Sequence, residues 1–192
     1  MQYLEDFAKK YGLFFSKPGN GICHVVHLQR FAVPGQFLVG ADSHTATHGS
    51  LGMLSIGVGG MDGAAVLAGE PLYIEMPEIL NIVLLGKLSA GVSAKDTILE
   101  ILNKLGVKRG TGKAIEYSGP GVKTLSVTER ATICNMGAEL GVTTSIFPSD
   151  ENTYQFLKTQ QREDVWTEIL PDKNAEYDAQ IEIDLAKIEP QV

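Results

Sequence analysis

The hydrophobic positions of this chain follow two periods, one typical of helices and one typical of β-strands. Residues 37–39 and 79–85 are apolar runs that favour buried strands, and apolar residues alternate with polar ones at 181–186 as in a half-buried strand. The same reasoning predicts a strand near 114–117 and helices at 3–11, 93–105, 126–140 and 150–161. Strands alternating with helices indicate the α/β class, and we expect a three-layer α/β/α arrangement around a mostly parallel sheet.

Two of the predicted helices carry end signals in the sequence. Ser93 with Asp96, and Ser126 with Glu129, have the spacing of a capping box, in which each side chain bonds the backbone N–H group of the other residue. A glycine follows both helices, at the position where a left-handed residue commonly ends a helix. The sequence therefore predicts where both helices begin and end.

The segment that follows the first apolar run is rich in glycine. Seven glycines lie between residues 49 and 69 among small apolar residues, which suggests helices packed very close to a sheet or backbone brought near a ligand. No Lys-Ser or Lys-Thr pair follows, so the segment is not a P-loop. Pro71 and Pro77 bracket the change from polar to apolar residues, and we place a domain boundary near Pro77.

The composition is that of an ordinary globular protein with an acidic balance. The 192 residues are 44% hydrophobic and 20% charged, with a formal net charge of −7 at pH 7. This balance leaves no basic stripe for a nucleic-acid backbone, and no uncharged apolar run has the length of a membrane span. Residues 3–11 are amphipathic rather than a signal core, so the sequence predicts a cytoplasmic protein that binds neither nucleic acid nor membranes.

Cysteine usage limits the redox and metal chemistry of the chain. Cys23 and Cys134 are its two cysteines, and they form neither a C-x-x-C pair nor a zinc spacing. A cubane cluster usually takes several thiolates. We therefore expect neither a disulfide framework nor a self-contained iron–sulfur site.

All four histidines lie between His24 and His48, and we expect the chemistry of the chain there. Asp42, Ser43 and His44 follow an apolar run, and α/β folds bind ligands at the carboxyl ends of parallel strands. An acid next to an imidazole suits proton transfer or substrate binding. A simple Asp-Ser turn is the alternative interpretation.

Other interpretations of the histidines stay open. His24 and His27 lie in an apolar context, where a core histidine bonded to a partner is the alternative to a catalytic one. His44 and His48 have the i, i+4 spacing of a helical metal pair. No third ligand accompanies them, so a zinc site is disfavoured and we predict no metal ligand.

A second set of polar residues lies on the predicted helix 126–140. Asn135 and Glu139 are four residues apart and hence on one helical face. A surface position for Glu139 is the alternative that the sequence alone also allows.

Four segments resemble the aconitase superfamily, which includes aconitases, homoaconitases and the large subunit of 3-isopropylmalate dehydratase. They are residues 35–45, 57–62, 119–122 and 131–145, in the family's order and at family-like spacing. Asp-Ser-His-Thr-Ala-Thr-His-Gly at 42–49 looks like the dehydratase side, whereas Asn-Met-Gly-Ala-Glu-Leu-Gly-Val-Thr-Thr at 135–144 looks closer to aconitase. The resemblance therefore leaves the subfamily open.

The resemblance implies roles for individual residues. The catalytic residues would be His24, Asp42, His44 and Glu139. The substrate-binding residues would be Asp42, Ser43, His44 and Asn135. His24 would pair with Asp42, and Glu139 would orient His44. Thr47 departs from the pattern, because aconitase proper has Asn there.

The resemblance also implies a reaction, the reversible dehydration and rehydration of a hydroxylated di- or tricarboxylic acid, with a [4Fe–4S] cluster as Lewis acid. The chain would be a fragment of such a hydro-lyase, with residues 1–77 as the C-terminal part of the first domain and 78–192 as the second. The cluster cysteines belong to segments absent here, so the chain alone is expected to hold no cofactor. Its partners would be the remaining domains or a small subunit. The alternative is a stand-alone domain that binds carboxylates or a partner protein without catalysis.

Overall fold

The computed structural model describes residues 2–107 and 109–191. Its α-helices are α1 (Gln2–Tyr11), α2 (Cys23–Arg30), α3 (Gly60–Leu67), α4 (Ala94–Leu105), α5 (Val127–Met136) and α6 (Glu151–Thr159). Its strands are β1 (Phe37–Gly40), β2 (Leu54–Gly57), β3 (Glu78–Leu85), β4 (Lys113–Ser118), β5 (Thr144–Ile146) and β6 (Ala179–Asp184). Short 3₁₀ helices are η1 (Ser43–Leu51), η2 (Pro120–Thr124), η3 (Gly137–Leu140), η4 (Glu163–Val165) and η5 (Leu185–Lys187).

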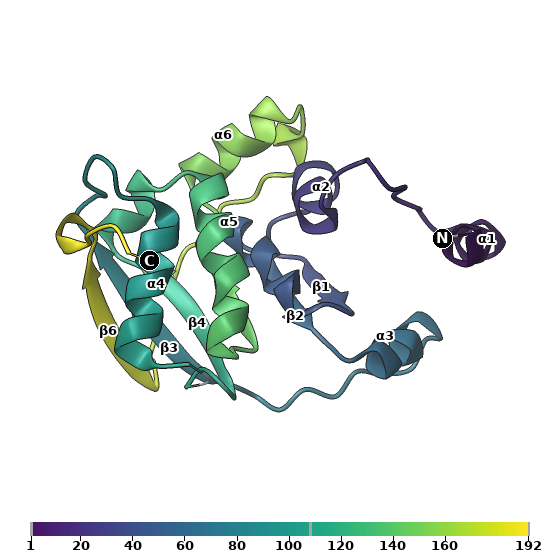
Figure 1. The fold of residues 1–192 in the computed structure, drawn as a ribbon, viewed down its shortest axis with the longest axis horizontal. Coiled ribbons are helices and arrows are strands. Elements are labelled where there is room, and N and C mark those ends of the chain that lie inside the picture. The colour runs from purple at the N-terminus through teal and green to yellow at the C-terminus, as the bar shows by residue number, and fades with distance from the viewer. Residues whose placement is uncertain (1, 108, 192) are drawn as a thin grey trace.

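The larger sheet has four strands in the order β5-β4-β3-β6, and every neighbouring pair is parallel (Figure 1). This confirms the expected α/β class with parallel strands, and it is consistent with a three-layer α/β/α fold of the aconitase type. The apolar run at 79–85 is the buried central strand β3, and the alternating run near the C-terminus pairs with it as the edge strand β6. The apolar run and the alternating pattern therefore each predicted a strand correctly.

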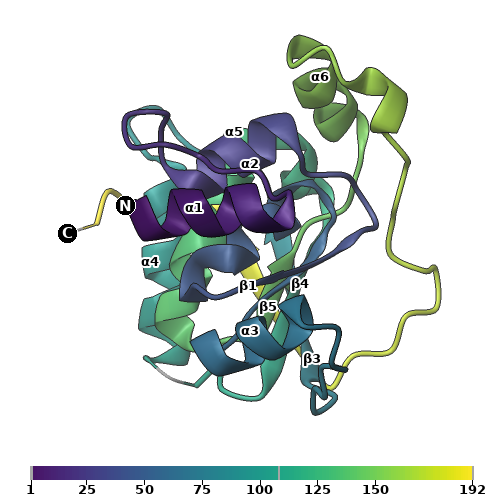
Figure 2. The ribbon, with the colours of Figure 1, turned by 90° about the vertical axis from the view of Figure 1, so that its right-hand side faces the viewer.

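One face of this sheet carries the main core. Ile82, Tyr117 and Ile183 point to the side on which α4 and α5 lie, and all three are at most 1% exposed. The other face is polar, with Asn81 bonded to Ser118 on the neighbouring strand. Figure 2 shows the extended segment between α6 and β6 on that side. The hydrogen bond from Tyr177 Oη to Glu116 Oε1, 2.7 Å long, attaches this segment to the sheet.

The smaller sheet pairs β1 with β2 in parallel, and it lies beside the edge strand β5. The hydroxyl of Thr144 in β5 donates to the carbonyl of Ser55 in β2 at 2.7 Å. The 3₁₀ helix η1 follows β1 and packs against β2, β5 and α5. This packing brings the Asp42-Ser43-His44 segment close to the end of α5.

The predicted helix 126–140 is shorter than the sequence indicated. The capping box between Ser126 and Glu129 is present, as is that between Ser93 and Asp96, but α5 ends at Met136 and η3 continues the chain. Gly137 lies at the junction, and a Cβ atom there would be 2.7 Å from Ser145 Oγ. Glycine leaves room for this close approach to β5, and it is also a poor helix former, which favours the end of α5 here.

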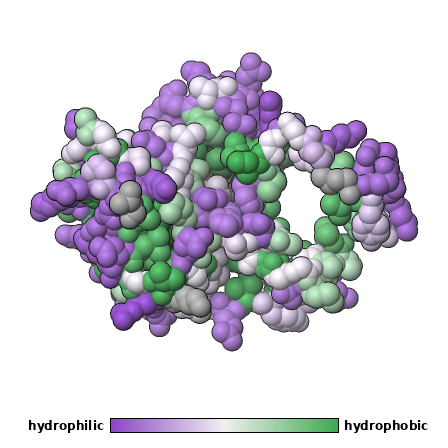
Figure 3. Space-filling model, viewed as in Figure 1, coloured by the Kyte–Doolittle hydropathy of each residue, from purple (hydrophilic) through white to green (hydrophobic). Residues whose placement is uncertain are grey.

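The N-terminal part is less buried than the rest of the molecule. Ala8 is the one buried residue of α1, and α3 has none, among the residues that the structure describes. The space-filling view shows an opening beside β1 and β2, on the side where α1 and α3 lie (Figure 3). Within the described ranges no helix combines the length and apolar character needed to cross a bilayer.

Candidate functional site

Asp42 is placed by the end of strand β1. Its backbone is extended, and its side chain caps η1 by accepting a 2.7 Å hydrogen bond from the backbone N–H of His44. Its carbonyl oxygen accepts a further bond from the Thr45 hydroxyl at 2.7 Å. Asp42 therefore does form the Asp-Ser turn that was the alternative interpretation. The turn also holds the Asp42 carboxylate in place, so both interpretations apply to the same residue.

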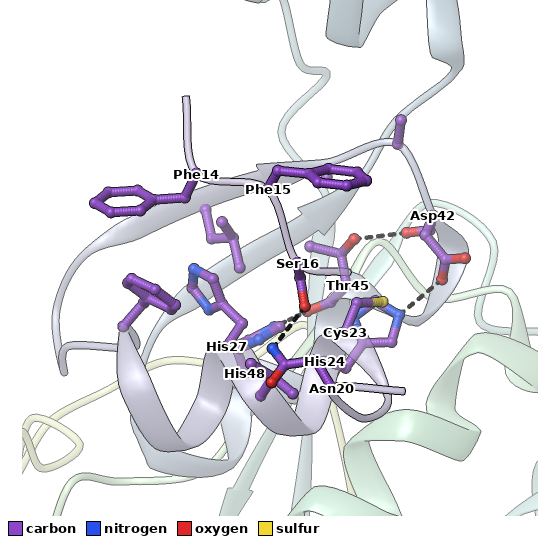
Figure 4. Close-up of a pocket in the computed structure, with 15 residues that line it drawn as sticks. Phe14, Phe15, Ser16, Asn20, Cys23, His24, His27, Asp42, Thr45 and His48 are labelled. Atoms are coloured by element: carbon purple, nitrogen blue, oxygen red, sulfur yellow. Dashed lines mark hydrogen bonds and ion pairs between the residues drawn. The ribbon is translucent and has the colours of Figure 1, made fainter. Parts of the chain in front are cut away.

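His24 lies on the first turn of α2 and faces this carboxylate. Its Nε2 is 3.0 Å from Asp42 Oδ1 (Figure 4). A carboxylate accepts and does not donate, so this contact selects the tautomer of His24 with hydrogen on Nε2. The backbone N–H of His44, with a further contribution from His24, holds the pKa of Asp42 below its ordinary value. Asp42 is therefore a carboxylate at neutral pH.

His44 lies between two carboxylates. Its Nδ1 is 3.4 Å from Asp42 Oδ1, and its Nε2 is 3.9 Å from Glu139 Oε1. The second distance is longer than a hydrogen bond and fits an ion pair or a water bridge. The structure therefore places His24 beside Asp42, and His44 near Glu139. Ser43 lies beside them, with its Oγ 3.4 Å from His44 Nδ1.

Asn135 joins the site through Thr47. Its Nδ2 donates to Thr47 Oγ1 at 3.0 Å, and the Thr47 hydroxyl donates to the carbonyl of His44 at 2.7 Å. The amide thus supports the backbone that carries His44.

Sequence reasoning gave too little weight to Thr47 and His48. Thr47 is 4% exposed and connects Asn135 to the η1 backbone. His48 is 2% exposed, and its Nδ1 is 2.9 Å from the carbonyl oxygen of Thr45. The sequence signal for both residues is the length of the polar run at 42–48. It is too long for a single turn, so some of its side chains must be buried. A zinc site there was disfavoured, and no group of three metal-binding side chains occurs among the described residues.

The described residues do not suit an iron–sulfur cluster. Cys134 is fully buried in the main core, its Sγ faces the Ser145 carbonyl at 3.6 Å, and burial raises the pKa of its thiol. A thiol held protonated in an apolar core is a poor cluster ligand. Cys23 is exposed on α2.

Curated relatives match nearly the whole chain. The mitochondrial aconitate hydratase of Arthroderma benhamiae is 45% identical over 197 residues, which are 99% of this chain and 25% of that protein. The probable mitochondrial aconitate hydratase of Caenorhabditis elegans and the mitochondrial homocitrate dehydratase of Saccharomyces cerevisiae are also 45% identical, with the same coverage. The chain therefore spans about a quarter of the length of these relatives.

These names contradict the cytoplasmic expectation, which is wrong by this comparison. The relatives are described as mitochondrial. The expectation rested on the composition and first residues of a chain that covers a quarter of the proteins it matches, and such a segment carries no information about the compartment of the whole.

The family assignment covers every residue. The model of the aconitase family (aconitate hydratase) matches residues 1–192. The match includes the segment that carries Asp42 and His44 and the α5–η3 segment that carries Asn135 and Glu139, which the fold places together. The chain belongs to the aconitase family.

Proposed function

We propose that this chain is part of a hydro-lyase that reversibly removes water from a hydroxylated di- or tricarboxylic acid. The observation that carries the proposal is the position of His44 between the carboxylates of Asp42 and Glu139, with His24 on the same Asp42. An imidazole that exchanges a proton near a substrate oxygen must be held in one orientation, and a carboxylate partner does this. The relatives named aconitate hydratase and homocitrate dehydratase support the same reaction class.

The proposed roles follow from the contacts. Asp42 fixes His24 and binds substrate, and Glu139 orients His44 so that its imidazole exchanges a proton at the departing oxygen. Ser43 and Asn135 would bind the substrate's carboxylate and hydroxyl groups. His44 is partly exposed, with 37% of its side chain accessible, so a substrate can reach the ring.

The family implies an iron–sulfur cluster in the full enzyme, where it supplies Lewis-acid chemistry. We propose that residues 1–77 complete a first domain and 78–192 form a second. The cluster ligands would then lie in the remaining domains, on the same polypeptide or on a separate subunit. The substrate would be of the citrate and isocitrate class or of the isopropylmalate and homocitrate class. Nothing among the described residues favours a stand-alone, non-catalytic domain over this proposal.

Replacing Glu139 with Gln in the whole protein that carries this chain is expected to lower kcat by roughly 10²-fold, because His44, the proposed acid–base group, would lose the carboxylate that orients it. The measurement is the rate of formation of the unsaturated acid from citrate, isocitrate and homocitrate. The matched control is Glu163→Gln, an exposed glutamate in η4. Equal rates for both variants would contradict the role of Glu139, and a wild-type protein inactive on these three acids and on isopropylmalate would contradict the proposed reaction.

The chain by itself is expected to take up no cluster. Anaerobic incubation of the 192-residue chain with iron and sulfide should give no stoichiometric metal after desalting, because the Cys134 thiol is buried and protonated. Iron and sulfide analysis and the visible spectrum are the measurements. A cubane spectrum would contradict the prediction. Its loss in Cys23→Ser or Cys134→Ser would identify that cysteine as a ligand, and its survival in both would point to ligands other than cysteine.

A further inference from the structure

The buried histidine of η1, His48, has no role in the proposed chemistry. It lines a cavity of about 620 Å³, together with His24 and Asp42 (Figure 4). Its ring contacts two imidazoles of α2. The ring centroid of His27 is 4.6 Å away with the planes at 90°, and that of His24 is 5.8 Å away with the planes at 70°. His48 therefore fills the space between η1 and the face of α2 that carries both histidines.

The protonation of His48 is fixed by its contacts. A carbonyl oxygen only accepts, so the 2.9 Å contact with Thr45 places the hydrogen of His48 on Nδ1. Its Nε2 is buried without a hydrogen-bond partner among the residues described. Burial lowers the pKa of His48 to about 4, and repulsion from His27 and His24 adds to this effect. Burial and the charge of Arg162 lower the pKa of His27 as well.

The bond to Asp42 fixes one atom of the His24 ring, and a further contact on the ring restricts its orientation. The Asp42 side chain is 54% exposed and that of His24 14% exposed, so water reaches the carboxylate and weakens its hold on the ring. The terminal torsion of histidine is broad, so a further contact must remove the alternative ring orientations. The His48 ring is that contact, because its centroid lies 5.8 Å from that of His24 with the two planes at 70°.

We infer that His48 is a positioning residue for His24, because its ring forms the wall that keeps the His24 imidazole aligned with the Asp42 carboxylate. The catalytic meaning of this alignment rests on the proposed function, whereas the alignment itself does not. His48 acts through another residue and touches no reacting atom. It remains neutral at pH 7, so it places no positive charge beside His24.

The four histidines of the chain all lie in this region, so imidazole ¹⁵N NMR on the 192-residue chain reports on the site directly. In the wild type at neutral pH, His24 should give the signature of the Nε2–H tautomer and His48 that of the Nδ1–H tautomer. His48→Ala should shift the two His24 nitrogens to the averaged values of a freely rotating imidazole. His48→Phe retains a ring at this position and should keep the Nε2–H signature of His24. Val25→Ala, an exposed change on the same helix, is the control.

Two results would overturn the inference. One is an unchanged His24 signature in His48→Ala. The other is loss of hydrogen-exchange protection at Leu28, a buried residue of α2, because His48 would then hold the helix and not the ring. In the whole protein, His48→Ala should lower kcat roughly tenfold, less than loss of an acid–base group, and His48→Phe should restore most of it. An inactive wild-type protein would contradict the proposed function. The NMR experiment would still test whether His48 positions His24.

Discussion

Replacing Arg130 with Met is expected to destabilise the protein by about 3–5 kcal/mol, the cost of leaving one member of a buried ion pair alone. The Arg130 side chain is fully buried, and it bonds both carboxylate oxygens of Asp150 at 2.9 and 2.7 Å. It also donates to the carbonyls of Val122, Leu125 and Pro148. Urea unfolding monitored by circular dichroism measures the loss.

The matched control is Arg30→Met, because Arg30 is an exposed arginine of α2. Adding Asp150→Asn to Arg130→Met should recover part of the stability, since it removes the unpaired buried charge and Asn still caps α6. An Arg130→Met variant as stable as Arg30→Met would contradict the assignment of a buried network. This network fixes α5, and α5 positions Asn135.

The sequence predicted the elements whose signals are local. The capping box of Ser126 and Glu129 and the apolar run 79–85 each specify their structure within a few residues, and both are present. The short strands β2 and β5 were missed, because runs of three or four residues become strands only through their neighbours. The helix α2 was missed as well. Its one buried residue is Leu28, so it carries no apolar stripe.

The sequence indicated the polar residues of the site but not the buried residues that pack behind them. Asp42, Ser43 and His44 stood out as a polar run after a strand, and the resemblance connected them to Glu139. Periodicity alone placed Asn135 and Glu139 on one helical face, whereas the structure divides them between α5 and η3. His48 could not be assigned from sequence. Its neutral state depends on burial and on two imidazoles from another helix.

Gly49 is where the two halves of the site meet. Its carbonyl accepts a 2.8 Å bond from the backbone N–H of Phe147, which joins η1 to the chain just after β5. A Cβ atom on Gly49 would lie 1.7 Å from the carbonyl oxygen of Ser145, far inside any possible contact. That neighbour is backbone and cannot rotate away. Glycine is therefore required at this position for η1 to lie against β5 and for His44 to approach Glu139.

Gly49→Ala is accordingly expected to destabilise the chain by about 3 kcal/mol, at the upper end for overpacking, and to separate His44 from Glu139. Urea unfolding gives the free energy, and the imidazole ¹⁵N shifts of His44 report the separation. The control is Gly60→Ala in α3, where a Cβ atom would have no neighbour within 4 Å and where alanine favours the helix. If Gly49→Ala retained the stability of Gly60→Ala together with wild-type His44 shifts, η1 and β5 could not be packed as described. The approach of Glu139 to His44 would then rest on the packing of η1 against α5 and η3 alone.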